Sequence, residues 1–150
     1  MFVAADAITA KRQLKAYLSA PVKAQLIAGD VWIAQLWSGD AAQAIAENPN
    51  IEYLVPDEGA SIFVDALVIP RSARHPRAAH EFMNYILRPA VGAAIADKTG
   101  YATPNQAALP LTRAKTPYPT ADLLARLEYQ TDLGVAAELW DRIWTEIKSS

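Results

Sequence analysis

The chain has 150 residues, of which 52% are hydrophobic and 20% are charged. A chain of this length can bury one hydrophobic core, and its composition excludes the disordered and fibrous classes. The formal net charge of −2 gives no basic surface of the kind that nucleic-acid-binding proteins use, so nucleic acid is not an expected partner. The sequence contains no cysteine, which excludes a disulfide framework and a thiolate metal site.

Membrane and targeting segments are not expected either. No apolar run approaches the roughly 18 residues that a membrane-spanning helix needs. Met1 is not followed by the basic and apolar regions of a secretory signal, so the sequence shows no export signal of its own.

The first thirty residues predict one broken helix or two short helices. An apolar face is formed at helical spacing by Leu14, Tyr17 and Leu18. Pro21 interrupts this pattern, and the second part is expected to stop at Gly29.

Strand and helix patterns then alternate. Residues 31–37 are apolar on both faces except at one glutamine, which is typical of a central strand in a mostly parallel sheet. Ser38 or Asp40 is expected to cap an alanine-rich helix over 41–47. Residues 51–55 predict a short strand.

A further strand is predicted over 61–69, after a turn at residues 56–59. The order of strand, helix and strand indicates an α/β fold with short, mostly parallel strands. The second half of the chain is expected to be helical. Its predicted elements are a helix from Pro76 to Arg88, a helix over 90–98 that closes at Gly100, an ordered loop over 101–120, and helices over 121–128 and 134–148.

Two of the predicted strand regions carry a carboxylate close to a large aromatic residue. Asp40 follows Trp37, and Asp65 follows Phe63. A carboxylate buried without a partner costs several kcal/mol in rough terms, so each acid needs an explanation.

Ordinary structural roles would explain most of these residues. Asp40 suits a helix N-cap, while Trp37 and Phe63 suit a hydrophobic core. Asp65 is different because it lies within a predicted strand, where aspartate is depleted and where it serves neither a cap nor a turn. It is therefore the acid that most favours a binding site. The two histidines, five residues apart, do not have the spacing of a metal site on one helical face, and no catalytic motif is present.

Five phrases of the sequence resemble the periplasmic polyamine-binding proteins, of the spermidine/putrescine type, of bacterial ABC transporters. They are "GDVWIAQLWSGDA", "VPDEGASIFVDALVIP", "AAHEFMNYILRP", "KTGYATPN" and "EYQTDLG". They occur in the family's order and at family-like spacing, from about Leu26 to the C-terminus. The resemblance implies a type II periplasmic-binding-protein-like fold of two lobes, which holds an extended amine in the cleft and delivers it to a membrane permease.

The resemblance also implies six ligand-binding positions. Trp37 matches the family's cleft tryptophan, and Asp40 lies where putrescine-preferring members carry an acid. Phe63 falls on an aromatic position and Asp65 on the ammonium-binding aspartate. The remaining two positions are Tyr101, which matches the tyrosine of the "GYxTPN" motif, and Gln130, which matches a glutamine of spermidine-type members. Taken without the resemblance, Tyr101 could be an anchoring residue after a helix, and Gln130 a solvated polar residue.

The implied protein is a periplasmic, non-catalytic transport component that needs no cofactor or metal. The resemblance covers only the C-terminal portion of the longer family members, so the chain is expected to be a fragment. Residues 1–70 would form part of one lobe, with a hinge strand near 61–69, and residues 71–150 a helical part that packs on the other lobe. The isolated chain is then expected to bind amine weakly or undetectably, because one wall of a clamp lacks most of the contacts that closure supplies.

Two alternatives remain within this interpretation. The cargo could be another small molecule, such as an opine or an amino-acid derivative. The chain could also be a module whose exposed lobe-interface surface is covered by a second copy, as a homo-oligomer. Because the sequence offers no obvious cation next to either acid, a ligand's ammonium group is the expected partner of both.

Overall fold

The computed structural model describes residues 4–19, 21–113 and 119–149. The chain forms two compact units, which are a terminal unit of Met1–Ser19 with Gln130–Ser150 and a central unit of Ala20–Tyr129. The predicted boundary near residue 70 does not separate these units, because contacts between elements on either side of it hold the central unit together. A division of the chain between two lobes near this point stays a prediction.

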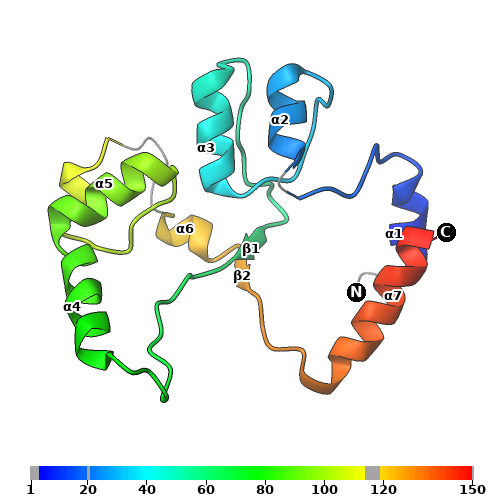
Figure 1. The fold of residues 1–150 in the computed structure, drawn as a ribbon. Helices are drawn as coiled ribbons and strands as arrows, with labels where there is room; N and C mark the ends of the chain where they lie inside the picture. Colours follow the sequence, from blue (N-terminus) through cyan, green and yellow to red (C-terminus); the bar gives the residue numbers. More distant parts are fainter. Residues whose placement is uncertain (1–3, 20, 114–118, 150) are drawn as a thin grey trace. The chain divides into compact units, whose positions relative to one another are not determined.

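The terminal unit pairs the two ends of the chain. Its elements are α1 (Ala4–Lys11), the short 3₁₀ helix η2 (Gly134–Ala136) and α7 (Ala137–Ser149). Figure 1 shows α1 beside α7, and the Lys11 ammonium donates a hydrogen bond of 2.8 Å to the Lys148 carbonyl. The expected helix over 134–148 is confirmed, with a 3₁₀ first turn.

The expected helical face of Leu14, Tyr17 and Leu18 is wrong, because α1 ends at Lys11 and a turn follows it, so residues 14–19 are not helical. The Tyr17 ring instead packs edge-on against Trp144 of α7, with ring centroids 4.9 Å apart. A tertiary contact has therefore prevailed over local spacing.

The central unit holds most of the helices. Its elements are α2 (Pro21–Ala28), α3 (Ser38–Glu47), β1 (Ala60–Ile62), α4 (Pro76–Ile86), α5 (Pro89–Thr99), the 3₁₀ helix η1 (Leu109–Leu111), α6 (Ala121–Leu124) and β2 (Leu127–Tyr129). Prolines begin α2, α4 and α5, where a missing N–H costs nothing. The predictions of α2, α3, α4 and α5 are confirmed to within a few residues.

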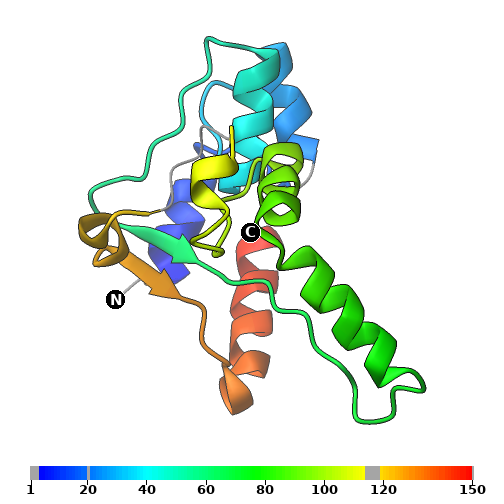
Figure 2. The same ribbon diagram turned by 90° about the vertical axis from the view of Figure 1, so that its left-hand side faces the viewer.

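The strands are shorter than the sequence predicts. In the described part of the chain, β1 and β2 form the sheet, a parallel pair in which Ala60 lies opposite Leu127 and Ile62 opposite Tyr129 (Figure 2). The parallel direction agrees with the expected α/β class. The predicted helix over 121–128 is wrong in its second half, because residues 127–129 pair with β1 instead of continuing α6.

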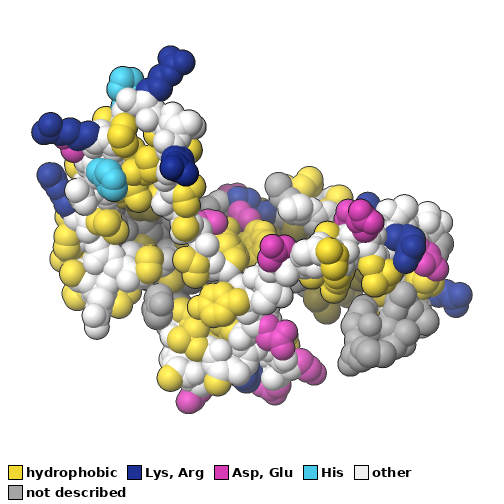
Figure 3. All heavy atoms as spheres, turned by 90° about the horizontal axis from the view of Figure 1, so that it is seen from below, with side chains coloured by type: hydrophobic (Ala, Val, Ile, Leu, Met, Phe, Trp, Pro, Cys, Tyr) yellow, Lys and Arg dark blue, Asp and Glu magenta, His cyan; other side chains and the backbone are white. Residues whose placement is uncertain are grey.

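The predicted strands over 31–37 and 51–55 are absent, and the one over 61–69 is reduced to β1. An apolar run forms a strand only where a neighbouring strand accepts its backbone hydrogen bonds, and none is paired with these stretches in the structure as described. Trp32 and Ile33 are consequently 93% and 94% exposed instead of lying in a central strand. Figure 3 shows apolar side chains at the surface in several places.

The core of the central unit consists of small side chains. The buried residues Ala41 and Ala44 of α3, Ala93 and Ala96 of α5, and Ala108 beside η1 let these elements approach closely. None of the helices described is long and apolar enough to span a membrane.

Candidate functional site

Three aromatic side chains of the central unit meet at the beginning of α3. Trp37 is the residue before this helix, Phe63 follows β1 directly, and Tyr101 comes two residues after α5. The Trp37 and Phe63 ring centroids are 4.7 Å apart, and those of Phe63 and Tyr101 are 6.4 Å apart, both edge-to-face. Trp37 is 43% and Phe63 38% exposed, so neither is a core residue in this structure.

Two glycines hold Tyr101 in this cluster. Gly100 ends α5 with a left-handed backbone (φ 78°), which turns the chain so that Tyr101 reaches α3. Gly39, in the first turn of α3, lies directly against the Tyr101 ring, and a Cβ at this position would overlap three ring atoms. The aromatic cluster therefore depends on the absence of a side chain at residue 39.

The two carboxylates predicted from the sequence also lie near Tyr101. Asp40 occupies the first turn of α3, where the helix dipole favours negative charge, and Asp65 lies in the irregular stretch after β1. Burial raises the pKa of the Tyr101 phenol, and the charges of Asp40 and then Asp65 raise it further. Five of the six predicted ligand positions thus gather in one place, on three elements of the central unit.

The expectation that Asp40 has no internal cation is wrong. The Lys23 ammonium of α2 is 3.3 Å from Asp40 Oδ1, and the side chains are 28% and 30% exposed. The cap interpretation of Ser38 or Asp40 is also wrong, because the N-cap is Trp37, without a side-chain cap hydrogen bond. The expected cost of burying an unpaired carboxylate therefore does not arise at either acid. Asp40 is paired with Lys23, and Asp65 is exposed to solvent.

Gln130, the sixth predicted position, is exposed and belongs to the terminal unit. Its role in binding stays a prediction. In the described ranges, no group of three or more His, Asp or Glu side chains could hold a metal ion.

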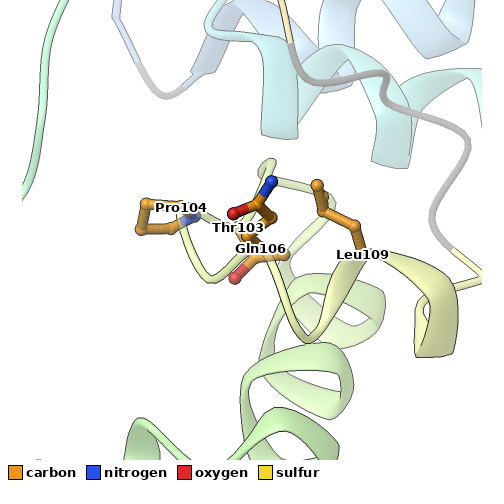
Figure 4. A pocket seen from close by; sticks show the side chains of 4 residues that line it. All are labelled: Thr103, Pro104, Gln106 and Leu109. Atoms are coloured by element: carbon orange, nitrogen blue, oxygen red, sulfur yellow. The ribbon is translucent and has the colours of Figure 1, made fainter.

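A hollow of about 310 Å³ lies beyond the aromatic cluster along the chain. Its lining side chains, labelled in Figure 4, are Thr103, Pro104, Gln106 and Leu109. None of them is charged, so the hollow offers no counter-ion for an ammonium group. The carboxylates and rings of the cluster are the better chemical candidate.

Sequence reasoning missed Lys23, Gly39 and Asn105. The Asn105 amide donates a 2.7 Å hydrogen bond to the Leu87 carbonyl, and its Oδ1 accepts one from the Ala107 N–H. Asn105 thereby ties the loop after Tyr101 to the end of α4. Gly39 and Asn105 could have been noticed in the sequence, because a glycine inside a helix pattern and an asparagine after a proline both mark special backbone positions. Lys23 could not, because its position beside Asp40 depends on how the helices pack.

The arrangement combines flat apolar faces with negative charge. Such faces attract cations through the ring quadrupole, at about 0.5–2 kcal/mol each depending on desolvation. A carboxylate adds charge-assisted hydrogen bonds, which contribute about 1.5–3 kcal/mol each. The site is therefore chemically suited to an organic ammonium ion attached to a methylene chain.

Known proteins with similar sequences bind such molecules. The spermidine/putrescine-binding periplasmic protein of Escherichia coli K12 is 32% identical over 126 residues, covering 81% of this chain and 36% of that protein. The putrescine-binding periplasmic protein of the same organism is 38% identical over 136 residues, with the same two coverages. A putrescine/cadaverine-binding protein of Pseudomonas aeruginosa is 29% identical over 153 residues, covering 94% of this chain and 43% of its own length.

The chain thus spans little more than a third of the length of the first two relatives. The family described as bacterial extracellular solute-binding protein matches residues 5–123, which is well over half of the chain. This match includes every element of the aromatic and acidic cluster. The chain belongs to the family of bacterial extracellular solute-binding proteins.

Proposed function

We propose that this chain is part of the solute-binding component of a bacterial ABC importer, and that its aromatic and acidic cluster binds a polyamine of the putrescine or spermidine type. The observation that carries the proposal is the convergence of three rings and two carboxylates on one surface of the central unit. The names of the relatives, all amine-binding, support the substrate class.

The roles of the residues follow from their chemistry. Trp37, Phe63 and Tyr101 provide apolar faces for the methylene chain and for an ammonium end. Asp65, which is exposed, accepts hydrogen bonds from an ammonium group without first losing a buried partner. Asp40 supplies a second negative charge beside the rings. Gln130 is proposed to contribute a polar contact at the amine.

Location and partner follow from the same proposal. Relatives named as periplasmic proteins support a periplasmic location. The protein is further proposed to deliver its ligand to a membrane permease. The protein is proposed to act by binding alone, without catalysis.

Isothermal titration calorimetry with putrescine and spermidine tests this function, extended to millimolar amine by NMR titration. Asp65→Asn keeps the size of the side chain and removes its charge, so it should abolish amine binding. Asp57→Asn is a matched control, because Asp57 is an exposed acid that pairs with Arg126 outside the cluster. Equal binding by the parent chain and Asp65→Asn would favour a different cargo, such as an opine.

Self-association is a second candidate, favoured by one observation. Several large apolar side chains outside the cluster are strongly exposed, among them Trp32, Ile33 and Val68. Large apolar side chains exposed in this way are typical of contact surfaces, and a second copy would cover them. Sedimentation velocity at high concentration should show a dimer, and a monomer throughout would contradict self-association.

A further inference from the structure

Lys23 is held in a fixed position beside the candidate site. Its ammonium donates a 2.8 Å hydrogen bond to Gln43 Oε1 and a 3.3 Å one to Asp40 Oδ1. Both acceptors lie on α3, and Figure 1 shows α2, which carries Lys23, alongside α3. An ammonium with two acceptors on one helix is more restrained than an ordinary surface lysine.

Gln43 is itself anchored. Its amide nitrogen donates a 2.8 Å hydrogen bond to the Thr99 carbonyl at the end of α5. The carbonyl oxygen of the Gln43 side chain is therefore oriented toward Lys23 and cannot turn away without breaking this bond. Helices α2, α3 and α5 together thus fix an internal cation at one of the two acids of the site.

The cluster then carries less negative charge than its two acids suggest. Asp40 and Asp65 contribute two negative charges near Tyr101, and Lys23 contributes one positive charge in contact with Asp40. In the described part of the chain, the ion pairs found do not include Asp65. Asp65 is left as the acid that can accept an ammonium from outside.

We propose that Lys23 is a specificity-determining residue, a built-in counter-ion that keeps a ligand's ammonium group away from Asp40 and directs it to Asp65. This inference rests on the proposed function and deepens it. A ligand ammonium approaching Asp40 meets a like charge at contact range and must compete for an oxygen that is already bonded. A singly charged amine, which needs only Asp65, avoids this repulsion.

Two amines with the same four-carbon chain separate the effect of a second ammonium group from that of the first. Butylamine carries one ammonium group, and putrescine carries two on the same methylene chain. The test compares their dissociation constants by NMR titration for the parent chain, Lys23→Met and Lys98→Met. Methionine keeps an unbranched, helix-compatible side chain of similar length. Lys98 is an exposed lysine near the end of α5, so its loss changes the net charge equally without touching Asp40.

Lys23→Met should tighten putrescine binding by about tenfold or more, because a like charge at contact range is removed. Butylamine binding should change by less than about threefold, since its ammonium group lies at Asp65. Lys98→Met should leave both constants within about twofold of the parent values, because screened surface charges act weakly. In Lys23→Met/Asp40→Asn the gain for putrescine should disappear, which shows that it acts through Asp40.

The outcomes separate the inference from the function on which it rests. Putrescine binding that is equal in the parent chain and in a folded Lys23→Met would overturn the inference and leave the proposed function standing. Amine binding by none of the variants would overturn the proposed function, and the inference with it. Circular dichroism checks folding, and Lys23→Gln, which keeps a hydrogen-bond donor toward Gln43, repeats the test should the methionine variant unfold.

Discussion

Replacing Gly39 by alanine tests the position of the Tyr101 ring. A methyl group at residue 39 would overlap the Cδ2, Cε2 and Cζ atoms of this ring, so the ring has to leave its place against α3. Gly92 provides a matched control in α5. A Cβ there would meet its nearest neighbours, on Ala108 and Asn105, at 3.5 Å or more, which is ordinary contact.

Two opposing contributions set the expected change in the free energy of unfolding. Alanine in place of glycine inside a helix stabilises by about 0.5–1 kcal/mol. Overpacking against a fixed group costs about 1–3 kcal/mol. Gly92→Ala should therefore raise the free energy of unfolding by about 0.5–1 kcal/mol. Gly39→Ala should lower it by up to about 2 kcal/mol. The two variants should then differ by about 1–3 kcal/mol.

Urea unfolding followed by circular dichroism measures both free energies of unfolding. Tyr101→Ala, which creates room for the methyl group, should convert the effect of Gly39→Ala from destabilising to neutral or stabilising. Equal stabilisation by Gly39→Ala and Gly92→Ala in the parent background would refute the contact between Gly39 and Tyr101.

Three further predictions concern the residues around this contact. The phenol of Tyr101 should ionise above its ordinary pKa of 10.0, because burial and the nearby carboxylates favour the neutral form. Spectrophotometric titration against Tyr101→Phe measures this, and Asp65→Asn should lower the value. Because the folded pKa is the higher one, the stability linked to this group is present up to the unfolded pKa and is lost as the pH rises through the folded pKa. Phe63→Ala, which removes both ring contacts, should weaken amine binding by about threefold to thirtyfold in calorimetry, whereas an unchanged affinity would exclude this ring from the site. Asn105→Ala breaks the solvent-exposed bond to the Leu87 carbonyl and should lower the free energy of unfolding by about 0.5–1.5 kcal/mol, whereas no loss would show that this bond does not hold the loop.

The helices of the central unit could be predicted from the sequence because their signals are local. Pro76 and Pro89 begin α4 and α5, and Gly100 ends α5 with the left-handed conformation that glycine adopts readily. Asp65 could be singled out from the sequence as a candidate site residue, since an acid within an apolar run is unusual wherever the run folds. Phe63 is implied only by the family resemblance, because its own pattern suits a hydrophobic core.

Strand pairing and the internal cation could not be predicted in this way. Residues 31–37 have the composition of a central strand, but strand formation depends on a neighbour that local pattern does not specify. The pairing of residues 127–129 with β1 joins segments more than sixty residues apart along the chain. Lys23 reaches Asp40 only because α2 packs on α3, a contact between elements whose own sequences predict no partner.

The location of a bound amine tests the central claim most directly. A ¹⁵N-labelled sample of the chain is titrated with putrescine while backbone amide signals are followed by NMR. The largest shifts should fall on Asp40, Phe63, Asp65 and Tyr101, and they should vanish in Asp65→Asn. Shifts concentrated instead along the uncharged hollow between Thr103 and Leu109, or persisting in Asp65→Asn, would contradict an amine site built from these rings and carboxylates.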